Sequence, residues 1–276
     1  MRLYLLCLFI FSCGGNSELS RINFTQYVDS KNLRIFGKED VDPDFLDKVA
    51  SSYDAMFGDN SKIDEDMRSH YLSTSLDKRV FQRVGLESSF SENESYADNG
   101  KIPGPYRHNC TDYIWQESSG GPRQINEVIE HLLHTVTNVI LNLAYPADWG
   151  FMNSSTRLRE AMQEAIDKGV YNVSQYDEFK GDTEGYNSVI TQEYAYWLIL
   201  AEWNYFDISG NRDNENITGN SEFSLGTSDE IRDQLPIGHK LYVDYIEKIL
   251  TVPDKQLIKS LFLSLIHISE PTRPID

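Results

Sequence analysis

Hydrophobic positions with helical spacing dominate the chain beyond residue 40. Between Gln124 and Leu143 apolar residues recur every three or four positions, which predicts an amphipathic helix with one buried face. From Val189 to Trp203 the chain is apolar on nearly every side, which is typical of a helix buried in a core. Further helices are expected at residues 42–58, 61–72, 154–169, 238–250 and 254–262.

Three short segments that precede the long amphipathic helix have the composition of strands. Residues 32–37, 78–85 and 112–116 carry β-branched and aromatic side chains, and a Ser-Gly-Gly-Pro turn leads from the third segment directly into the helix. Few strands among many helices predict a helix-dominated α+β fold, with one domain over residues 31–262. Residues 209–233, rich in Asn, Gly and Ser, are expected to form a long loop.

The polar face of the amphipathic helix carries candidate metal ligands. Glu127, Glu130, His131 and His134 fall within roughly 100° of one another on a helix wheel. Imidazole and carboxylate groups are the usual protein ligands of divalent metals. No Lys or Arg interrupts this face. The alternative is that the face is simply solvated, opposite an ordinary apolar stripe.

Glu193 stands in the middle of the second, apolar helix. A buried carboxylate is costly unless it is paired or bound to a metal, and the Glu/His face is its best available partner. In the alternative interpretation, Glu193 lies near the helix start and accepts hydrogen bonds from free backbone N–H groups.

The order of a strand, a metal-competent helix and a buried helix with Glu resembles the gluzincin group of zincin metallopeptidases. In that family the first helix carries His-Glu-x-x-His, whose two His bind zinc and whose Glu is the general base, and a later Glu is the third ligand. Here Glu193-Tyr-Ala matches the later element, and His134 matches the second His. Glu130 and His131 stand in exchanged order, so the resemblance implies a degenerate zincin-like fold: a small N-terminal sheet with an edge strand, the active-site helix, then the buried glutamate helix.

Two ligand sets stay open under this resemblance. In the first, Glu130, His134 and Glu193 bind the metal and His131 takes the position of the general base. In the second, His131, His134 and Glu193 bind it, and Glu127 or Glu130 is the base. Either set leaves a coordination position open for water. Zinc is the expected metal, while two carboxylates would also suit Mn or Fe.

The stretch from Glu127 to Trp197 is also similar to a group of uncharacterised secreted proteins of marine bacteria. The shared features are a Glu-x-x-x-His helix, a Tyr-Pro pair after it, an Ala-Met helix and a Glu-Tyr-x-Tyr-Trp helix; here they are Glu130 with His134, Tyr145-Pro146, Ala161-Met162 and Glu193 to Trp197. This similarity implies a shared fold and no established activity.

Both ends of the chain are expected to lie outside the folded domain. Residues 1–12 carry one positive charge and a short apolar run, which predicts a signal peptide. Ile10 to Gly14 resembles the lipobox of bacterial lipoproteins, which implies lipidation of Cys13 and a tether over residues 13–30; plain secretion is the alternative. Residues 263–276 resemble a translated sequencing-library adapter, so His267 and Glu270 belong to no site.

Charge and cysteine content narrow the classes of function. The formal net charge of −18 argues against a nucleic-acid partner, because such binding depends on Lys and Arg. With Cys7 in the signal and Cys13 lipidated, Cys110 has no partner for an intramolecular disulfide.

The predicted function is a metal-dependent, peptidase-like hydrolase of the bacterial cell envelope, lipid-anchored or secreted, acting on a peptide or protein. The alternatives are a non-catalytic lipoprotein that binds metal or a partner, and a protein without a metal site.

Overall fold

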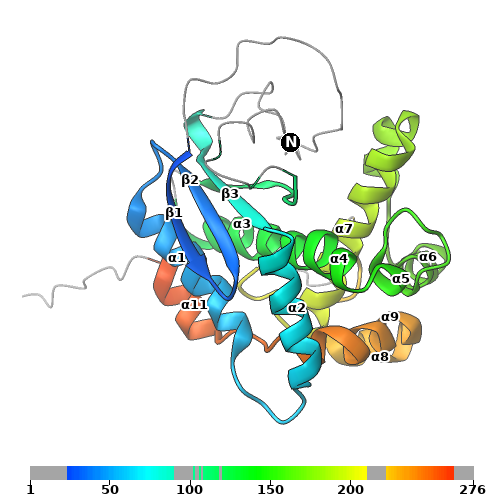
Figure 1. Ribbon diagram of the computed structural model, residues 1–276. Coiled ribbons are helices and arrows are strands. Elements are labelled where there is room, and N and C mark those ends of the chain that lie inside the picture. Colours follow the sequence, from blue (N-terminus) through cyan, green and yellow to red (C-terminus); the bar gives the residue numbers. More distant parts are fainter. Residues whose placement is uncertain are drawn as a thin grey trace, which may run out of the picture.

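The computed structural model describes residues 24–89, 102, 106, 108–117, 120–209 and 222–263. In this part of the chain, one small sheet packs against a larger assembly of helices (Figure 1). The helix-dominated α+β class that the sequence predicted is therefore confirmed. The predicted signal segment, the lipidation position Cys13 and residues 264–276 lie outside the described residues.

The sheet has four strands in the order β1-β2-β3-β4, and β4 at one edge leads toward the Glu/His helix. β1 pairs antiparallel with β2, whereas β2, β3 and β4 pair in parallel. The strands are β1 (Phe24–Ser30), β2 (Leu33–Lys38), β3 (Phe81–Leu86) and β4 (Tyr113–Gln116).

β1 differs from the sequence-based expectation, which extended a tether to residue 30. Phe24–Ser30 alternate between more and less exposed positions, as a strand at a sheet edge does. The hairpin to β2 turns at Lys31 and Asn32, whose φ angles of 44° and 63° are those of a two-residue hairpin turn. β1 contains several polar residues, as a linker does. Its composition therefore did not reveal the alternation of buried and exposed positions.

Helices form the rest of the described fold. The long ones are α1 (Pro43–Asp54), α2 (Glu65–Asp77), α3 (Gly121–His134), α6 (Arg157–Asp167), α7 (Thr183–Glu202) and α11 (Lys255–Phe262). The shorter ones are α4 (Asn142–Ala144), α5 (Pro146–Trp149), α8 (Ser228–Gln234), α9 (Pro236–Leu241) and α10 (Glu247–Ile249). Among the helices described, none combines the length and the hydropathy that a bilayer crossing requires.

One of these helices falls in a segment that was expected to be a loop. α8 begins inside residues 209–233, so the loop prediction is wrong for its C-terminal part. The reason is a capping box: the Thr227 hydroxyl accepts a hydrogen bond from the Glu230 N–H, and the Glu230 carboxylate accepts one from the Thr227 N–H. Satisfying these helix-end groups lets a short, polar segment form a helix.

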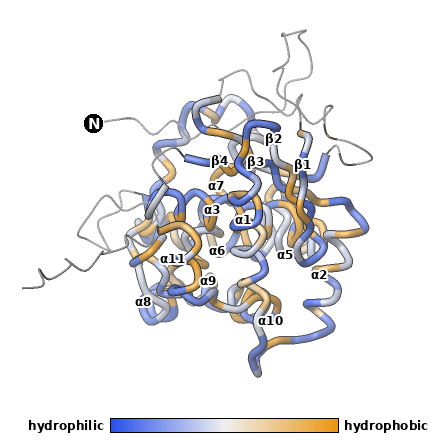
Figure 2. Tube along the Cα trace, turned by 90° about the vertical axis from the view of Figure 1, so that its left-hand side faces the viewer, coloured by the Kyte–Doolittle hydropathy of each residue, from blue (hydrophilic) through white to orange (hydrophobic). Residues whose placement is uncertain are grey.

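The core is centred on α3 and α7, which contact each other and lie near the middle of the trace (Figure 2). α3 also contacts β4, and α7 contacts α6 and α8. The apolar stripe predicted for α3 is fully buried in this core; it includes Ile125, Val128, Ile129, Leu132 and Leu133. The opposite, polar side of α3 therefore meets β4 and α7, and the candidate ligands lie there.

Candidate metal centre

The start of α3 is determined by two glycines and a proline. Gly120 and Gly121 have φ angles of 58° and 75°, the left-handed region that glycine enters without strain. Pro122 stands in the first turn of the helix, where a missing N–H costs nothing. Because Glu130 and His134 are four residues apart on this helix, their side chains project from the same side of α3.

Directly after His134 the helix continues as a π-helical segment, Thr135–Leu141, before α4. Segments of this kind are often found at functional sites. Here Asn138 from the π segment donates hydrogen bonds to Ser188 and Gln192 of α7. The segment therefore ties the Glu/His helix to the helix that carries Glu193.

Glu193 lies deep inside α7 and not at its start. Asp182 caps α7 by accepting hydrogen bonds from the N–H groups of Glu184 and Gly185, so the free N–H groups are far from Glu193. The interpretation of Glu193 as a carboxylate at the helix start is therefore wrong. Its side chain is only 2 % exposed and lies beside His134 on the polar face of α3. A second carboxyl, Glu222, is also close: burial, and after it the charge of Glu193, raises the pKa of Glu222 to about 8.

Glu130, His134 and Glu193 form one group, in which each residue offers a ligand-type atom within 4.8 Å of the others. Glu130 and His134 are 8 % and 1 % exposed, so the interpretation of this face as solvated is wrong for both. Burial raises the pKa of Glu130 to about 7; the neighbouring His131 opposes this shift and the charge of Glu193 adds to it. Ionising both buried carboxyl groups beside a single imidazole is therefore unfavourable unless a further positive charge compensates.

The separation of His134 from Glu193 is longer than a direct hydrogen bond and is that of an ion pair or of two ligands of one metal ion. His134 Nε2 and Glu193 Oε1 are 3.6 Å apart, both are buried, and neither has a hydrogen-bond partner among the described residues. A direct hydrogen bond would bring such atoms to about 2.7–3.0 Å. Two ligands bound tetrahedrally to zinc at about 2.1 Å lie about 3.4 Å apart. The observed spacing is closer to the metal-bridged value, so these residues fit a metal ion.

Glu130 is held by a polar chain that runs toward α7. Its Oε2 accepts a hydrogen bond of 2.8 Å from Asn126 Nδ2. Asn126 Oδ1 in turn accepts one of 3.0 Å from the Tyr196 hydroxyl. These contacts fix one oxygen of the carboxylate and so the orientation of the Glu130 side chain.

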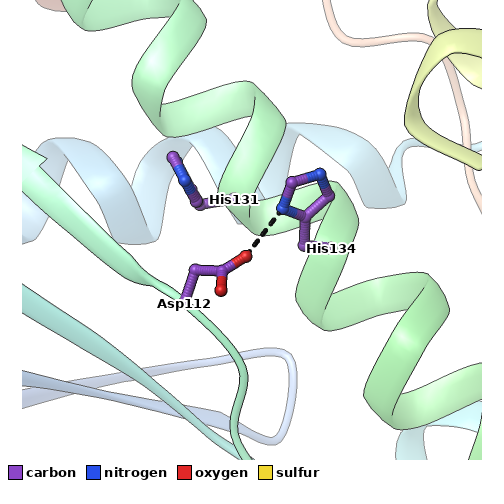
Figure 3. Close-up of side chains that lie close together, drawn as sticks. All are labelled: Asp112, His131 and His134. Atoms are coloured by element: carbon purple, nitrogen blue, oxygen red, sulfur yellow. Dashed lines mark hydrogen bonds and ion pairs between the residues drawn. The ribbon is translucent and has the colours of Figure 1, made fainter. Parts of the chain in front are cut away.

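The opposite nitrogen of His134 contacts Asp112, a residue that the sequence analysis missed. Asp112 Oδ2 lies 2.9 Å from His134 Nδ1, and Figure 3 shows this contact with His131 on the preceding turn of the helix. Burial alone would lower the pKa of His134, but the carboxylates of Glu193 and Asp112 outweigh it and raise this pKa well above 6.5. For Asp112, burial is outweighed by His134, and the pKa of this carboxyl is lowered.

His131 and Glu127, the predicted catalytic residues, lie beside the ligand group. His131 Nδ1 is 2.7 Å from the Glu127 carbonyl oxygen, so this nitrogen carries the proton and donates it. Glu127 Oε1 accepts a hydrogen bond of 2.8 Å from the Trp115 N–H and so fastens β4 to α3. Burial raises the pKa of Glu127, although the nearby His131 opposes it.

A second group with ligand-type atoms within 4.8 Å of one another contains Asp112, His131 and His134. The 2.9 Å contact between Asp112 and His134 has hydrogen-bond length, and His131 Nδ1 is already engaged with a carbonyl oxygen. This group is therefore better described as hydrogen-bonded support for His134. Of the two open ligand sets, the structure brings together Glu130, His134 and Glu193, while His131 converges with Asp112 instead of Glu193.

His239 of α9 belongs to a separate cluster, which it forms with the C-terminal end of α7. Its Nδ1 is 2.7 Å from Glu202 Oε1, and the Ser228 hydroxyl donates to Glu202 Oε2 at 2.7 Å. Glu202 is nine positions after Glu193 on α7, which is about 13 Å along the helix axis. This cluster fastens α8 and α9 to α7 and takes no part in the metal centre.

Comparisons with known proteins identify no relative of this chain. No family model, no curated protein and no solved structure matches it. The zincin-like resemblance therefore stays a prediction.

Proposed function

We propose that this protein is a metal-dependent hydrolase whose divalent ion is held by Glu130, His134 and Glu193. The observation that carries the proposal is the buried pair of His134 Nε2 and Glu193 Oε1, which lie 3.6 Å apart and have no hydrogen-bond partner among the described residues. Leaving a buried polar atom unsatisfied costs about 1–3 kcal/mol, and a shared metal ion would satisfy both atoms. Zinc is the first candidate, and the two carboxylates also suit Mn or Fe.

When bound, the metal would polarise a carbonyl group and acidify a water molecule. We assign the proton-acceptor role to His131, whose ring lies 5.4 Å from that of His134, centroid to centroid. Since Nδ1 donates to the Glu127 carbonyl, the neutral ring keeps the lone pair on Nε2. Glu127 orients His131 and joins it to β4. A peptide or protein substrate at the cell envelope is the expectation that the zincin and lipoprotein resemblances supply.

The direct test combines metal content with hydrolysis. The purified chain is stripped with a chelator, reloaded with zinc, manganese or iron, and assayed on a broad peptide library. We expect one tightly bound ion per chain and metal-dependent turnover, both lost in His134→Ala. The exposed His70, which contacts the Ala144 carbonyl oxygen and the Tyr145 ring outside the ligand group, provides the matched control His70→Ala. Turnover that persists without metal and in His134→Ala contradicts the proposal.

The burial of the ligand group favours one other candidate function, a non-catalytic metal-binding protein. Glu130, His134 and Glu193 are all buried, which limits the access of a substrate to the ion. In structural metal sites every coordination position is closed by the protein. One bound ion with no hydrolysis of any library peptide would favour this second function over the first.

A further inference from the structure

We propose that Asp112 and Gln192 are positioning residues that fix the protonated nitrogen of His134, so that its Nε2 lone pair faces Glu193 and Glu130. This inference rests on the proposed function for its consequence, which is tighter metal binding. The arrangement of protons on His134 is a property of the chain itself and can be measured without any metal.

Two donors converge on a single oxygen of Asp112. His134 Nδ1 lies 2.9 Å from Asp112 Oδ2, and Gln192 Nε2 donates to the same atom at 2.7 Å. An ionised carboxylate can only accept hydrogen bonds, so the neutral His134 ring must carry its proton on Nδ1. In the neutral ring, the form that binds a metal, Nε2 is then a bare lone pair; this buried atom lies 3.6 Å from Glu193 Oε1 and has no hydrogen-bond partner among the described residues.

The orientation of the Gln192 amide follows from its contacts. Gln192 Oε1 accepts hydrogen bonds from the Thr111 hydroxyl at 2.8 Å and from Asn138 Nδ2 at 3.1 Å. The ionised Asp112 carboxylate can only accept, so the Gln192 NH₂ group must face it, and the amide oxygen then faces Thr111 and Asn138. Gln192 is the residue immediately before Glu193, so the same turn of α7 supplies one ligand and the residue that holds the orienting carboxylate.

Asp112 is also fixed through its backbone. Its carbonyl oxygen accepts a hydrogen bond of 2.8 Å from Gln82 Nε2, and Gln82 Oε1 accepts one of 2.6 Å from the hydroxyl of Thr135. Thr135 follows His134 directly in the chain. Contacts from β3, the segment before β4, the π segment and α7 therefore meet at the His134 ring, whose Nε2 has no hydrogen-bond partner among the described residues.

A buried polar network could exist only to satisfy its own members. The network around Asp112 has a further effect. A carboxylate that accepts a hydrogen bond from the non-ligating nitrogen of a metal-binding His fixes the ring and raises the basicity of the ligating nitrogen. Removing such a partner typically weakens metal binding by about 10–100-fold. Zinc affinity and the proton position on His134 are thus the two quantities that Asp112 should control.

The experiment compares the full chain with Asp112→Ala and Asp112→Asn. ¹⁵N NMR of the metal-free protein, at a pH where the ring is neutral, reports which nitrogen of His134 carries the proton, and competition with a chelator gives the zinc affinity. We expect the wild type to be protonated on Nδ1, and Asp112→Ala to lose this preference and to bind zinc roughly 10–100-fold more weakly. An Asp112→Ala protein with the wild-type proton position and zinc affinity overturns the proposal.

Asp112→Asn keeps an acceptor oxygen for both donors and removes the charge. We expect it to retain the proton on Nδ1 and to lose about 10-fold in zinc affinity. If the alanine variant fails to fold, this variant decides: a 10-fold loss supports the proposal and unchanged affinity overturns it. The exposed Asp47 gives the matched control Asp47→Asn, which should change neither quantity. A wild type that binds no zinc but shows the Asp112-dependent proton position would refute the proposed function and leave the positioning inference standing.

Discussion

Replacing Glu130 with Gln should stabilise the metal-free protein at neutral pH while weakening its metal binding. Burial raises the pKa of Glu130 from 4.5 to about 7. The folded chain then keeps this proton to a higher pH than the unfolded chain does, so the free energy of unfolding falls as the pH rises from about 4.5 to about 7. A difference of about 2.5 pKa units corresponds to about 3 kcal/mol, fully expressed above pH 7.

Gln has the shape of Glu and can accept the same hydrogen bond from Asn126 Nδ2, so the variant removes mainly the charge. At pH 8 we expect Glu130→Gln to be more stable than the wild type by about 3 kcal/mol, a rise in Tm of roughly 6–12 °C. At pH 4.5 the two proteins should be equally stable, because the wild-type carboxyl is then protonated when folded.

The assay is urea unfolding in the presence of a chelator at pH 4.5, 6 and 8. The exposed Glu39 provides the control Glu39→Gln, which should follow the wild type at each pH. A stability difference between Glu130→Gln and the wild type that is the same at pH 4.5 and pH 8 would refute this reasoning. So would a Glu130→Gln protein that zinc stabilises as much as it stabilises the wild type.

Three further predictions concern the proton acceptor, the sheet and a helix cap. His131→Gln should retain the metal but lose about 10²-fold or more in hydrolysis of a peptide substrate, as expected for a general base; loss of the metal in this variant would count against the role. Gly85→Ala should destabilise the fold by about 1–3 kcal/mol in thermal unfolding, because a Cβ there would lie 2.3 Å from the Trp115 ring. Thr227→Ala should cost about 1 kcal/mol by removing the cap of α8, and the zinc affinity should not change.

The two helices that carry the ligands could be predicted from the sequence because residue spacing and runs of apolar residues are local features. The spacing of Glu130 and His134 places both on one helix face whatever the rest of the fold does. The apolar residues around Glu193 predicted its burial in the same way, and the structure places it against His134. Tertiary contact was needed to separate the two ligand sets, because His131 and Glu130 are neighbours on the same helix and only the position of α7 selects Glu130.

Asp112 was missed because the sequence placed it as the first residue of a predicted strand, where nothing in the local pattern marks it as a partner of a distant His. Its role becomes visible only when α3 and α7 bring His134 and Gln192 to the same carboxylate oxygen. The π segment after His134 was missed for a different reason: its apolar residues fit the 3.6-residue period well enough to extend the predicted α-helix. Both features are set by packing between elements, and a single-sequence pattern does not record such packing.

The measurement that tests the central claim most directly is the metal content of the purified chain after chelator treatment and reloading. The wild type should hold one zinc, manganese or iron ion per chain after extensive dialysis. The ion should be lost in His134→Ala and in Glu193→Gln, while His70→Ala should hold it as the wild type does. A wild type that retains none of these three metals, or a His134→Ala protein that retains the ion as tightly as the wild type, would contradict the account.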